Sequence, residues 1–313
     1  MTSIDNLIIT GCNGFVGQSL LSYISNLDLD DQPRKITTFN RSDKSKEVLP
    51  KYPNLNIDYR IANLAQPWTF EIQNAHLINL AADGSINAYS ENSSQLFTTI
   101  GSNCAQWIRH NKPTKVFHAS SGATYGVIPL ASNNTLENRD FDELSRKKTF
   151  IKSRLTIENT LSNLAKEEDI KIIIGRLFSF LGPNILNKTQ YAVSFFIHSA
   201  IKNRVITVNG NPNTVRSYLH ESDMSDWILK SFQIENHLDL ISIGSSIEVT
   251  ISELAEFIAS ATGADVEYLN PNAPGDIYIA DDASTLERLG VSETKNWQDG
   301  VMECIEIAKG LKN

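Results

Sequence analysis

The sequence has few cysteines, no excess of positive charge and no long apolar run. Its three cysteines, Cys12, Cys104 and Cys304, are too few and too far apart in the chain for a disulfide framework or a zinc site. Against 36 acidic residues stand 28 basic ones, so the formal charge is −8, and the basic residues are scattered along the chain. A nucleic-acid binder usually carries a basic stripe, so we expect no nucleic-acid partner.

No stretch reaches the roughly 20 consecutive apolar residues that a membrane-spanning helix needs. The first ten residues place Asp5 before a short apolar run and contain no basic segment, unlike a secretory signal peptide. With 41% hydrophobic residues, the chain can bury a large core. We therefore expect a cytoplasmic protein with no membrane contact and no metal site.

Short apolar runs alternate with amphipathic segments of helix length, which predicts an α/β fold with a doubly wound parallel sheet. The runs of strand length are 7–10, 36–40, 57–61, 76–81, 115–120, 170–175 and 240–244. Apolar residues recur at helical spacing around 94–110 and 150–166, which predicts two long crossover helices.

The alternation of strands and helices breaks after residue 175. Turn-rich segments at 182–184, 209–213 and 270–275 interrupt it and predict a smaller, discontinuous second lobe. We expect residues 1–175, with returning segments near 205–245, to form the main domain, and residues 176–313 to form most of the second lobe. Thr250 and Glu253 fit a capping box that opens a helix there.

A glycine-rich segment lies between the first predicted strand and a helical pattern. It reads Thr10-Gly11-Cys12-Asn13-Gly14-Phe15-Val16-Gly17. Its glycines allow a tight turn, a close approach of the backbone to a pyrophosphate and close packing of the helix on the strand. The free N–H groups of the helix N-terminus favour phosphates. This context predicts a Rossmann domain that binds NAD or NADP.

The end of the second predicted strand bears on which coenzyme binds. A carboxylate usually accepts hydrogen bonds from the ribose hydroxyls of NAD at this place. Here the residues are Asn40, Arg41 and Ser42. A guanidinium can pair with a 2′-phosphate, so this segment favours NADP, while a solvated Arg41 with NAD as coenzyme remains the alternative.

Five further segments follow in order along the chain. They are Asn63 and Leu64; Leu80, Ala81 and Ala82; residues 120–126; residues 176–183; and residues 216–223. Together with the glycine loop, they resemble the extended short-chain dehydrogenase/reductase family, in particular its nucleotide-sugar epimerases and dehydratases, over nearly the whole chain.

This resemblance implies a dinucleotide on the N-terminal lobe, a nucleoside-diphosphate sugar on the C-terminal lobe, and chemistry in the cleft between them. The implied cofactor contacts are Gly11, Asn13, Gly14, Phe15, Val16, Gly17, Asn40, Arg41, Ser42, Asn63, Leu64, Leu80, Ala81, Ala82 and Arg154. The implied substrate contacts are Ser121, Ser179, Gln190, Tyr191 and Arg216. Arg216 would bind the diphosphate; the alternative is a surface ion pair with Asp223 or Glu221.

The family's acid/base pair is a Tyr-x-x-x-Lys motif, in which the lysine binds the nicotinamide ribose and lowers the pKa of the tyrosine. In this chain Phe150 stands at the tyrosine position and Arg154 at the lysine position, and no tyrosine is followed four residues later by lysine. Ser121 stands at the family's serine. Phe150 carries no proton-transferring atom, and losing such a group typically slows the reaction by roughly 10² to 10⁴.

Substitutes for the missing base can be ranked by position. Lys147 shares a helix face with Phe150, whereas Lys152 points away. Tyr125 follows Ser121 closely, but relatives carry a tyrosine there in addition to the catalytic one. Ser121 alone is a poor base. No single substitute is favoured.

Two functional hypotheses follow from these residues. Gly122 and Ala123 replace the Asp-Glu pair of the family's dehydratases, so standard 4,6-dehydration is disfavoured. An epimerase- or oxidoreductase-type enzyme with a non-standard centre is the leading hypothesis, and a catalytically inactive dinucleotide-binding protein is the alternative. The three histidines at 118, 198 and 220 are expected to be packed or superficial. The helices around 94–110 and 150–166 correspond to the family's homodimer interface.

Overall fold

The computed structural model describes residues 4–82, 90–126, 128–129 and 148–310 of this protein. The chain divides into two compact units. The first unit comprises Met1–Thr124, Leu144–Arg176 and Ser225–Ile241; the second comprises Tyr125–Glu143, Leu177–Met224 and Ser242–Asn313.

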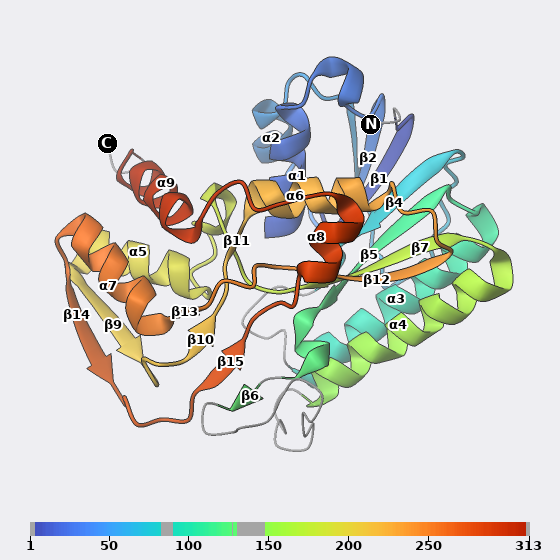
Figure 1. Ribbon diagram of the computed structural model, residues 1–313. Helices are drawn as coiled ribbons and strands as arrows, with labels where there is room; N and C mark the ends of the chain where they lie inside the picture. The colour runs from blue at the N-terminus through green and yellow to red at the C-terminus, as the bar shows by residue number, and fades with distance from the viewer. Residues whose placement is uncertain (1–3, 83–89, 127, 130–147, 311–313) are drawn as a thin grey trace. The chain divides into compact units, whose positions relative to one another are not determined.

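A seven-stranded sheet forms the centre of the first unit (Figure 1). Its strands are β1 (Asn6–Thr10), β2 (Lys35–Asn40), β3 (Ile57–Ile61), β4 (Ala75–Asn79), β5 (Lys115–Ser121), β7 (Lys171–Leu177) and β12 (Leu238–Ile243). They lie in the order β12-β7-β5-β4-β1-β2-β3, and β1 pairs in parallel with both β2 and β4. All seven strands predicted from the apolar runs are present.

The central strands are apolar at successive positions because helices cover both faces of the sheet. In β1, Leu7, Ile8 and Ile9 are fully buried. A strand with one solvated face would instead alternate apolar and polar residues. The edge strand β3 shows the contrast, since none of its five residues is buried.

Five helices belong largely to the first unit. They are α1 (Phe15–Ser25), α2 (Ser45–Val48), α3 (Glu91–Asn111), α4 (Lys148–Glu168) and α6 (Glu221–Ser231), with 3₁₀ turns at Leu29–Asp31, Leu49–Lys51 and Gly122–Tyr125. Figure 1 shows α3 and α4 on one face of the sheet and α1 with α6 on the other. Tyr23 Oη donates to Asp226 at 2.7 Å and joins α1 to α6. This is the doubly wound Rossmann fold expected from the sequence.

The helices α3 and α4 pack closely against each other. A Cβ atom placed on Gly101 of α3 would lie 2.6 Å from the side chain of Ile157 on α4, so glycine is required at this crossing. Phe97, Trp107 and Leu161 join the apolar core that these helices form with the sheet. The two long helices are thereby fixed side by side beneath the strand ends.

The described residues of the second unit form short strands and four helices. Its sheets have the orders β13-β10-β15-β6, β11-β8 and β14-β9. The strands are β6 (Ile128–Pro129), β8 (Phe180–Leu181), β9 (Val205–Asn209), β10 (Val215–Arg216), β11 (Leu219–His220), β13 (Val249–Thr250), β14 (Asp265–Leu269) and β15 (Asp276–Tyr278). The helices are α5 (Ala192–Asn203), α7 (Ile251–Thr262), α8 (Ala283–Leu289) and α9 (Trp297–Gly310), with a 3₁₀ turn at Pro183–Ile185.

The helices α5, α7 and α9 enclose a second apolar core with β9. Ile197, Ile258 and Ile305, one from each helix, are fully buried in it. The predicted capping box at the start of α7 is confirmed: Thr250 Oγ1 accepts from Glu253 N at 3.1 Å, and Glu253 accepts from Thr250 N at 2.7 Å. The second unit thus has its own hydrophobic core.

Candidate functional site

The glycine loop of the first unit turns from β1 directly into α1. Gly11 has a φ of 73°, a left-handed conformation that glycine adopts without strain. A Cβ atom on Gly17 would lie 2.4 Å from the Cα of Cys12, so only glycine lets α1 pack this closely on the turn. The helix α1 begins after Gly14, an N-cap residue that has no side chain to cap it. These amides suit a phosphate ligand.

A chain of buried hydrogen bonds fixes the strand ends beside this loop. Thr10 Oγ1 donates to Asn79 Oδ1 at 2.6 Å, and Asn79 Nδ2 lies 3.0 Å from His118 Nδ1. Thr10 Oγ1 also accepts from the backbone N–H groups of Leu80 and Ala81 at 3.1 and 3.2 Å. Strands β1, β4 and β5 and the segment 80–82 are therefore held in one arrangement.

His118 is part of this chain and is 1% exposed. Burial lowers its pKa to about 3, and the positive charge of Arg154 adds to the effect. A neutral imidazole can accept from Asn79 at Nδ1. His118 is thus a packed histidine, as expected, and so is His220, whereas His198 is exposed.

The end of β2 presents only part of the predicted ribose contacts. Asn40 is 2% exposed, and its Nδ2 donates inward to Thr38 Oγ1 at 3.1 Å. Arg41 and Ser42 are exposed. The carbonyl oxygen of Ser42 accepts from Asn13 Nδ2 of the glycine loop at 3.2 Å. The polar groups that face outward here come from 41–42 and not from Asn40.

The segment after β3 is anchored by aromatic rings. Trp68 Nε1 donates to the carbonyl oxygen of Leu64 at 3.0 Å, and Trp107 Nε1 donates to that of Phe70 at 2.7 Å. Phe70 stacks on Phe39 of β2 with ring centroids 3.8 Å apart. Asn63 is exposed at the start of this segment. The predicted adenine contacts therefore lie on a well-anchored turn.

Ser121 lies at the carboxyl end of β5, and its Oγ accepts from Ala123 N at 3.2 Å. The preceding residue, Ser120, donates to Glu158 Oε1 at 2.5 Å. Glu158 forms a buried ion pair with Arg176, with Nη2 and Oε2 2.6 Å apart. This network ties α4 to β5 and β7 and sets the position of the helix that carries residues 150 and 154.

The guanidinium of Arg154 is held between two phenyl rings. Its Cζ lies 3.3 Å from the centroid of Phe97 and 4.2 Å from that of Phe150. Arg154 is 6% exposed, and desolvated contacts of a guanidinium with aromatic faces are worth about 2 kcal/mol. Phe150 therefore contacts the residue at the lysine position through its ring and supplies no proton-transferring atom.

The other residues considered as substitutes for the missing base lie in different parts of the chain. Lys147 lies outside the described residues. Lys152 is exposed while Phe150 is buried, in agreement with its expected orientation away from residue 150. Tyr125 belongs to the second unit, where its Oη lies 3.4 Å from Ser242 Oγ and its ring stacks on Phe178.

Arg216 of the second unit pairs with a residue that the sequence did not indicate. Its Nη1 lies 2.5 Å from Oδ1 of Asp276, which is on the neighbouring strand β15. The alternative ion pair with Asp223 or Glu221 is therefore wrong. The carboxylate of Glu221 accepts from Asn184, and that of Asp223 from Thr294.

The remaining predicted substrate contacts lie near or on α5. Gln190 is exposed, Tyr191 is 41% exposed at the N-cap of α5, and Ser179 is partly buried. On the helix itself, Phe195 is 44% exposed whereas Phe196 is buried. Two aromatic rings are therefore available at the start of this helix.

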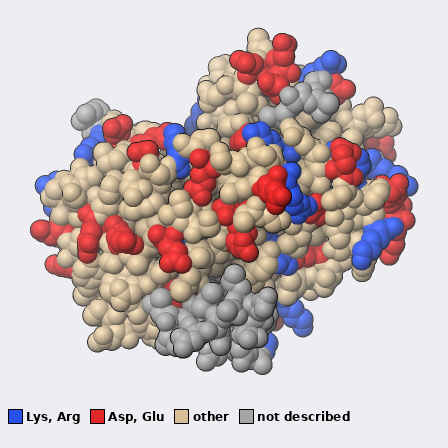
Figure 2. Space-filling model, in the orientation of Figure 1, with Lys and Arg blue, Asp and Glu red and all other residues tan. Residues whose placement is uncertain are grey.

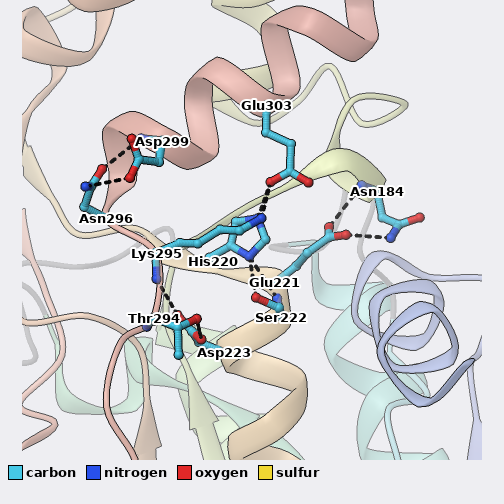
Figure 3. A network of polar contacts seen from close by, with 10 residues as sticks. All are labelled: Asn184, His220, Glu221, Ser222, Asp223, Thr294, Lys295, Asn296, Asp299 and Glu303. Carbon is cyan, nitrogen blue, oxygen red and sulfur yellow. Dashed lines mark hydrogen bonds and ion pairs between the residues drawn. The ribbon is translucent and has the colours of Figure 1, made fainter. Parts of the chain in front are cut away.

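A polar network of the second unit joins β11 and the first turn of α6 to α9 (Figure 3). His220 Nδ1 lies 2.7 Å from Ser222 Oγ, and His220 Nε2 lies 3.1 Å from Glu303 Oε2. Lys295 Nζ reaches the same Glu303 oxygen at 2.6 Å. Burial lowers the pKa of His220, and Ser222 N donates to Nδ1 at the start of α6. This network caps a helix and is structural.

The described residues include no group of three or more His, Cys, Asp or Glu side chains that could hold a metal ion. Among the described helices, none is long and apolar enough to cross a membrane. Figure 2 shows acidic and basic side chains scattered over the visible face, without a basic stripe.

A Rossmann sheet with an uncapped glycine-loop helix and pinned strand ends defines the first unit as a dinucleotide-binding fold. The chain belongs to the NAD dependent epimerase/dehydratase family, whose sequence profile matches residues 7–244. The resemblance to nucleotide-sugar epimerases and dehydratases is thus confirmed.

Two curated relatives illustrate the range of activities in the family. The dTDP-4-dehydro-6-deoxyglucose reductase of Escherichia coli is 24% identical, with 96% of this chain and 97% of that protein covered. UDP-glucuronic acid decarboxylase 3 of Arabidopsis thaliana is 22% identical, with 86% and 78% covered. Among solved structures, the dTDP-glucose 4,6-dehydratase from Bacillus anthracis in complex with NAD matches with a TM-score of 0.80 at 16% identity, covering 97% of this chain and 96% of that one.

Proposed function

We propose that this protein is an NAD(P)-dependent enzyme of epimerase or oxidoreductase type that acts on a nucleoside-diphosphate sugar through a non-standard catalytic centre. The observation that carries this proposal is the glycine loop, with its uncapped helix N-terminus and the strand ends pinned by Thr10 and Asn79. Family membership supports the substrate class, because the relatives named above act on nucleotide sugars.

The residues of the first unit fit a dinucleotide. The amides that begin α1 after Gly14 would bind the pyrophosphate, and Gly17 lets α1 pack closely on the turn that carries them. Residues 63–64 and 80–82 would border the adenosine and nicotinamide portions, and Arg154 would lie at the nicotinamide ribose. These residues would hold a coenzyme whose nicotinamide ring would supply hydride-transfer chemistry when bound.

NADP is the coenzyme that we propose, although the solved dehydratase noted above holds NAD. Asn40 is turned inward onto Thr38 and offers no carboxylate to a ribose. Arg41 and Ser42 are exposed at the strand end, where a 2′-phosphate would lie.

The second unit is the proposed sugar-nucleotide lobe. Arg216 would bind the diphosphate once it leaves Asp276, and Ser179, Gln190 and Tyr191 would contact the rest of the ligand. Ser121 would share the reacting hydroxyl. Because Phe150 transfers no proton, another group would supply the acid/base step, and the candidates remain Lys147, Tyr125 and Ser121.

The test is turnover by the purified protein with a panel of UDP-, dTDP- and ADP-sugars. Product formation with transient absorbance at 340 nm supports the proposal. Calorimetry comes first: if well-folded protein binds neither NAD⁺ nor NADP⁺, the proposed function is wrong whatever the later segments show.

A second candidate function is dinucleotide binding without catalysis. The observation that favours it is the position of Arg154, whose guanidinium is occupied by the rings of Phe97 and Phe150. Coenzyme binding without turnover would support this candidate. The double variant Phe150→Tyr/Arg154→Lys restores the family's pair, and we expect it to create or raise activity by roughly 10²-fold or more.

We also propose a homodimer that pairs α3 and α4 of two copies. A groove of about 700 Å³ runs along these helices. Hydroxyl and amide side chains line it together with one charge of each sign, at Glu91 and Lys152. Of the large apolar side chains that are exposed in the described residues, none lies on either helix. Contacts across this face would therefore be polar.

A further inference from the structure

Tyr59 connects two segments that the sequence analysis treated separately. It lies on the edge strand β3, with Thr38 of β2 beside it in the register. Its Oη donates toward Asn13 Oδ1 at 2.9 Å and toward the carbonyl oxygen of Ser42 at 3.1 Å, and it accepts from Lys44 N at 3.1 Å. One hydroxyl thus joins the glycine loop to the loop after β2.

The hydrogen bonds around the Tyr59 hydroxyl form a ring with Asn13 and Ser42. Asn13 Nδ2 donates to the same carbonyl oxygen of Ser42 at 3.2 Å, so Asn13 meets Tyr59 and Ser42 with both ends of its amide. Burial raises the pKa of Tyr59, which keeps the phenol protonated and able to donate at neutral pH. The backbone from 42 to 44 is therefore fixed relative to the phosphate-binding turn.

The side chains carried by this loop set its charge. Arg41 and Lys44 are exposed beside it. The nearest carboxylate, Asp43, accepts from Ser45 N at 2.9 Å and from Ser45 Oγ at 2.6 Å, so Ser45 already occupies it. Glu47 lies 3.7 Å from Lys44 Nζ as an exposed pair of little strength. A phosphate on the adenosine ribose would meet the cations Arg41 and Lys44, while the carboxylate of Asp43 is directed to Ser45.

We propose that Tyr59 is a positioning residue for coenzyme choice: by clamping residues 42–44 to Asn13, it holds Arg41 where the 2′-phosphate of NADP lies. This inference rests on the proposed function, because it requires the dinucleotide to occupy the glycine loop. Tyr59 contacts the glycine loop at the side-chain oxygen of Asn13 and not at the amides that begin α1. Its loss therefore weakens NADP⁺ binding and leaves NAD⁺ binding nearly unchanged.

The experiment measures dissociation constants of NADP⁺ and NAD⁺ by calorimetry for the full chain. We expect Tyr59→Phe to weaken NADP⁺ about tenfold and NAD⁺ less than about twofold, since two loop contacts are lost. Tyr52→Phe is the matched control, because Tyr52 Oη donates to the carbonyl oxygen of Gln18 at 3.1 Å and lies outside the clamp. The ratio of the dissociation constants for NADP⁺ and NAD⁺ should be the same in Tyr52→Phe as in the wild type.

A double-mutant cycle with Arg41→Ser tests whether Tyr59 acts through Arg41. In the Arg41→Ser background, Tyr59→Phe should have no further effect on NADP⁺ affinity. Additive losses would overturn the inference, as would an unchanged ratio in Tyr59→Phe or a wild type that prefers NAD⁺. Wild-type protein that binds neither coenzyme would instead refute the proposed function itself.

Folding of the variant must be checked by thermal melting. If Tyr59→Phe does not fold, Tyr59→Leu removes the same hydroxyl from this half-buried strand position and leaves the glycine loop unchanged. The same selective loss of NADP⁺ affinity supports the inference, and an equal loss for both coenzymes contradicts it.

Discussion

At the scale of single residues, the contacts of Arg154 explain why the altered catalytic pair is compatible with a folded site. The ring of Phe150 and the guanidinium of Arg154 are one helical turn apart and stack directly. A tyrosine at residue 150 would keep that stacking and add a hydroxyl. The two residue types were evident from the sequence. The second ring, from Phe97 on α3, was not, because no local spacing pattern links the two helices.

Arg216 gives a second prediction at this scale. Asp276 occupies one side of its guanidinium, so an incoming diphosphate must compete with a carboxylate. We expect Asp276→Asn to raise the affinity for UDP about tenfold, because the competing charge is removed while the shape is kept. Isothermal titration with UDP measures this.

The matched control is Asp265→Asn, which removes an exposed charge from β14 of the same unit. It should leave UDP affinity unchanged. A Kd for Asp276→Asn equal to or higher than that of the wild type would show that Arg216 serves only to join β10 to β15.

His118 predicts a pH dependence of stability. Its pKa is lowered to about 3 in the folded protein, whereas an unfolded histidine titrates near 6.5. Between these values only the unfolded state binds the proton, so stability is lost as the pH falls below about 6.5. The expected slope is about 1.4 kcal/mol per pH unit. Burial also lowers the pKa of His76, to about 4.

Urea unfolding between pH 5 and pH 7 tests this. His118→Gln keeps an acceptor for Asn79, and its free energy of unfolding should fall less steeply from pH 7 to pH 5, by the slope that one proton contributes. His110→Gln, at an exposed position of α3, should leave the slope unchanged. Parallel curves for wild type and His118→Gln would contradict the assignment of a neutral buried imidazole.

At the scale of elements, the sequence predicted all seven strands of the main sheet. The central strands stood out because buried parallel strands are apolar at successive positions, whereas the edge strand β3 has no buried residue. The ends differed by one or two residues, as for β4, which stops at Asn79 where the apolar run extends to residue 81. Strand β4 ends at Asn79, whose side-chain amide hydrogen-bonds with Thr10 and lies beside His118.

Pairings between distant strands could not be read from the sequence. Tyr59 reaches the glycine loop because β3 lies beside β2, and Asp276 meets Arg216 because β15 lies beside β10. Neither pair shares a local spacing pattern. For the same reason the sequence did not show that Asn40 faces inward, because which side of a strand faces the core depends on its neighbours.

The close packing of α1 on the glycine loop at Gly17 can be tested by substitution. A methyl group at Gly17 would overlap the backbone of Cys12, which cannot move without displacing the turn. We therefore expect Gly17→Ala to destabilise the protein by roughly 1–3 kcal/mol and to weaken coenzyme binding. Differential scanning calorimetry and coenzyme titration measure the two effects.

Gly310→Ala provides the comparison, because a Cβ atom there meets nothing within 4 Å. Its stability should match or slightly exceed that of the wild type. If Gly17→Ala melted at the wild-type temperature and bound coenzyme equally well, the close packing of α1 on the turn would not be required.

At the scale of the whole molecule, the polar face of α3 and α4 governs the proposed dimer. Because its contacts would be hydrogen bonds and charge pairs, we expect dimers at micromolar concentration that weaken with salt. Lys152→Glu should shift sedimentation toward the monomer, and Lys202→Glu on α5 should not. A wild type that sediments only as a monomer would reject the dimer.

The aromatic anchor after β3 has a practical consequence. Trp68 bonds to the carbonyl oxygen of Leu64, next to Asn63, and lies within 6.1 Å of Trp107, measured between ring centroids. Two of the chain's four tryptophans therefore surround the turn on which adenine would rest. Their emission should report coenzyme arrival directly, so that binding can be followed in a fluorimeter without labels, substrates or turnover.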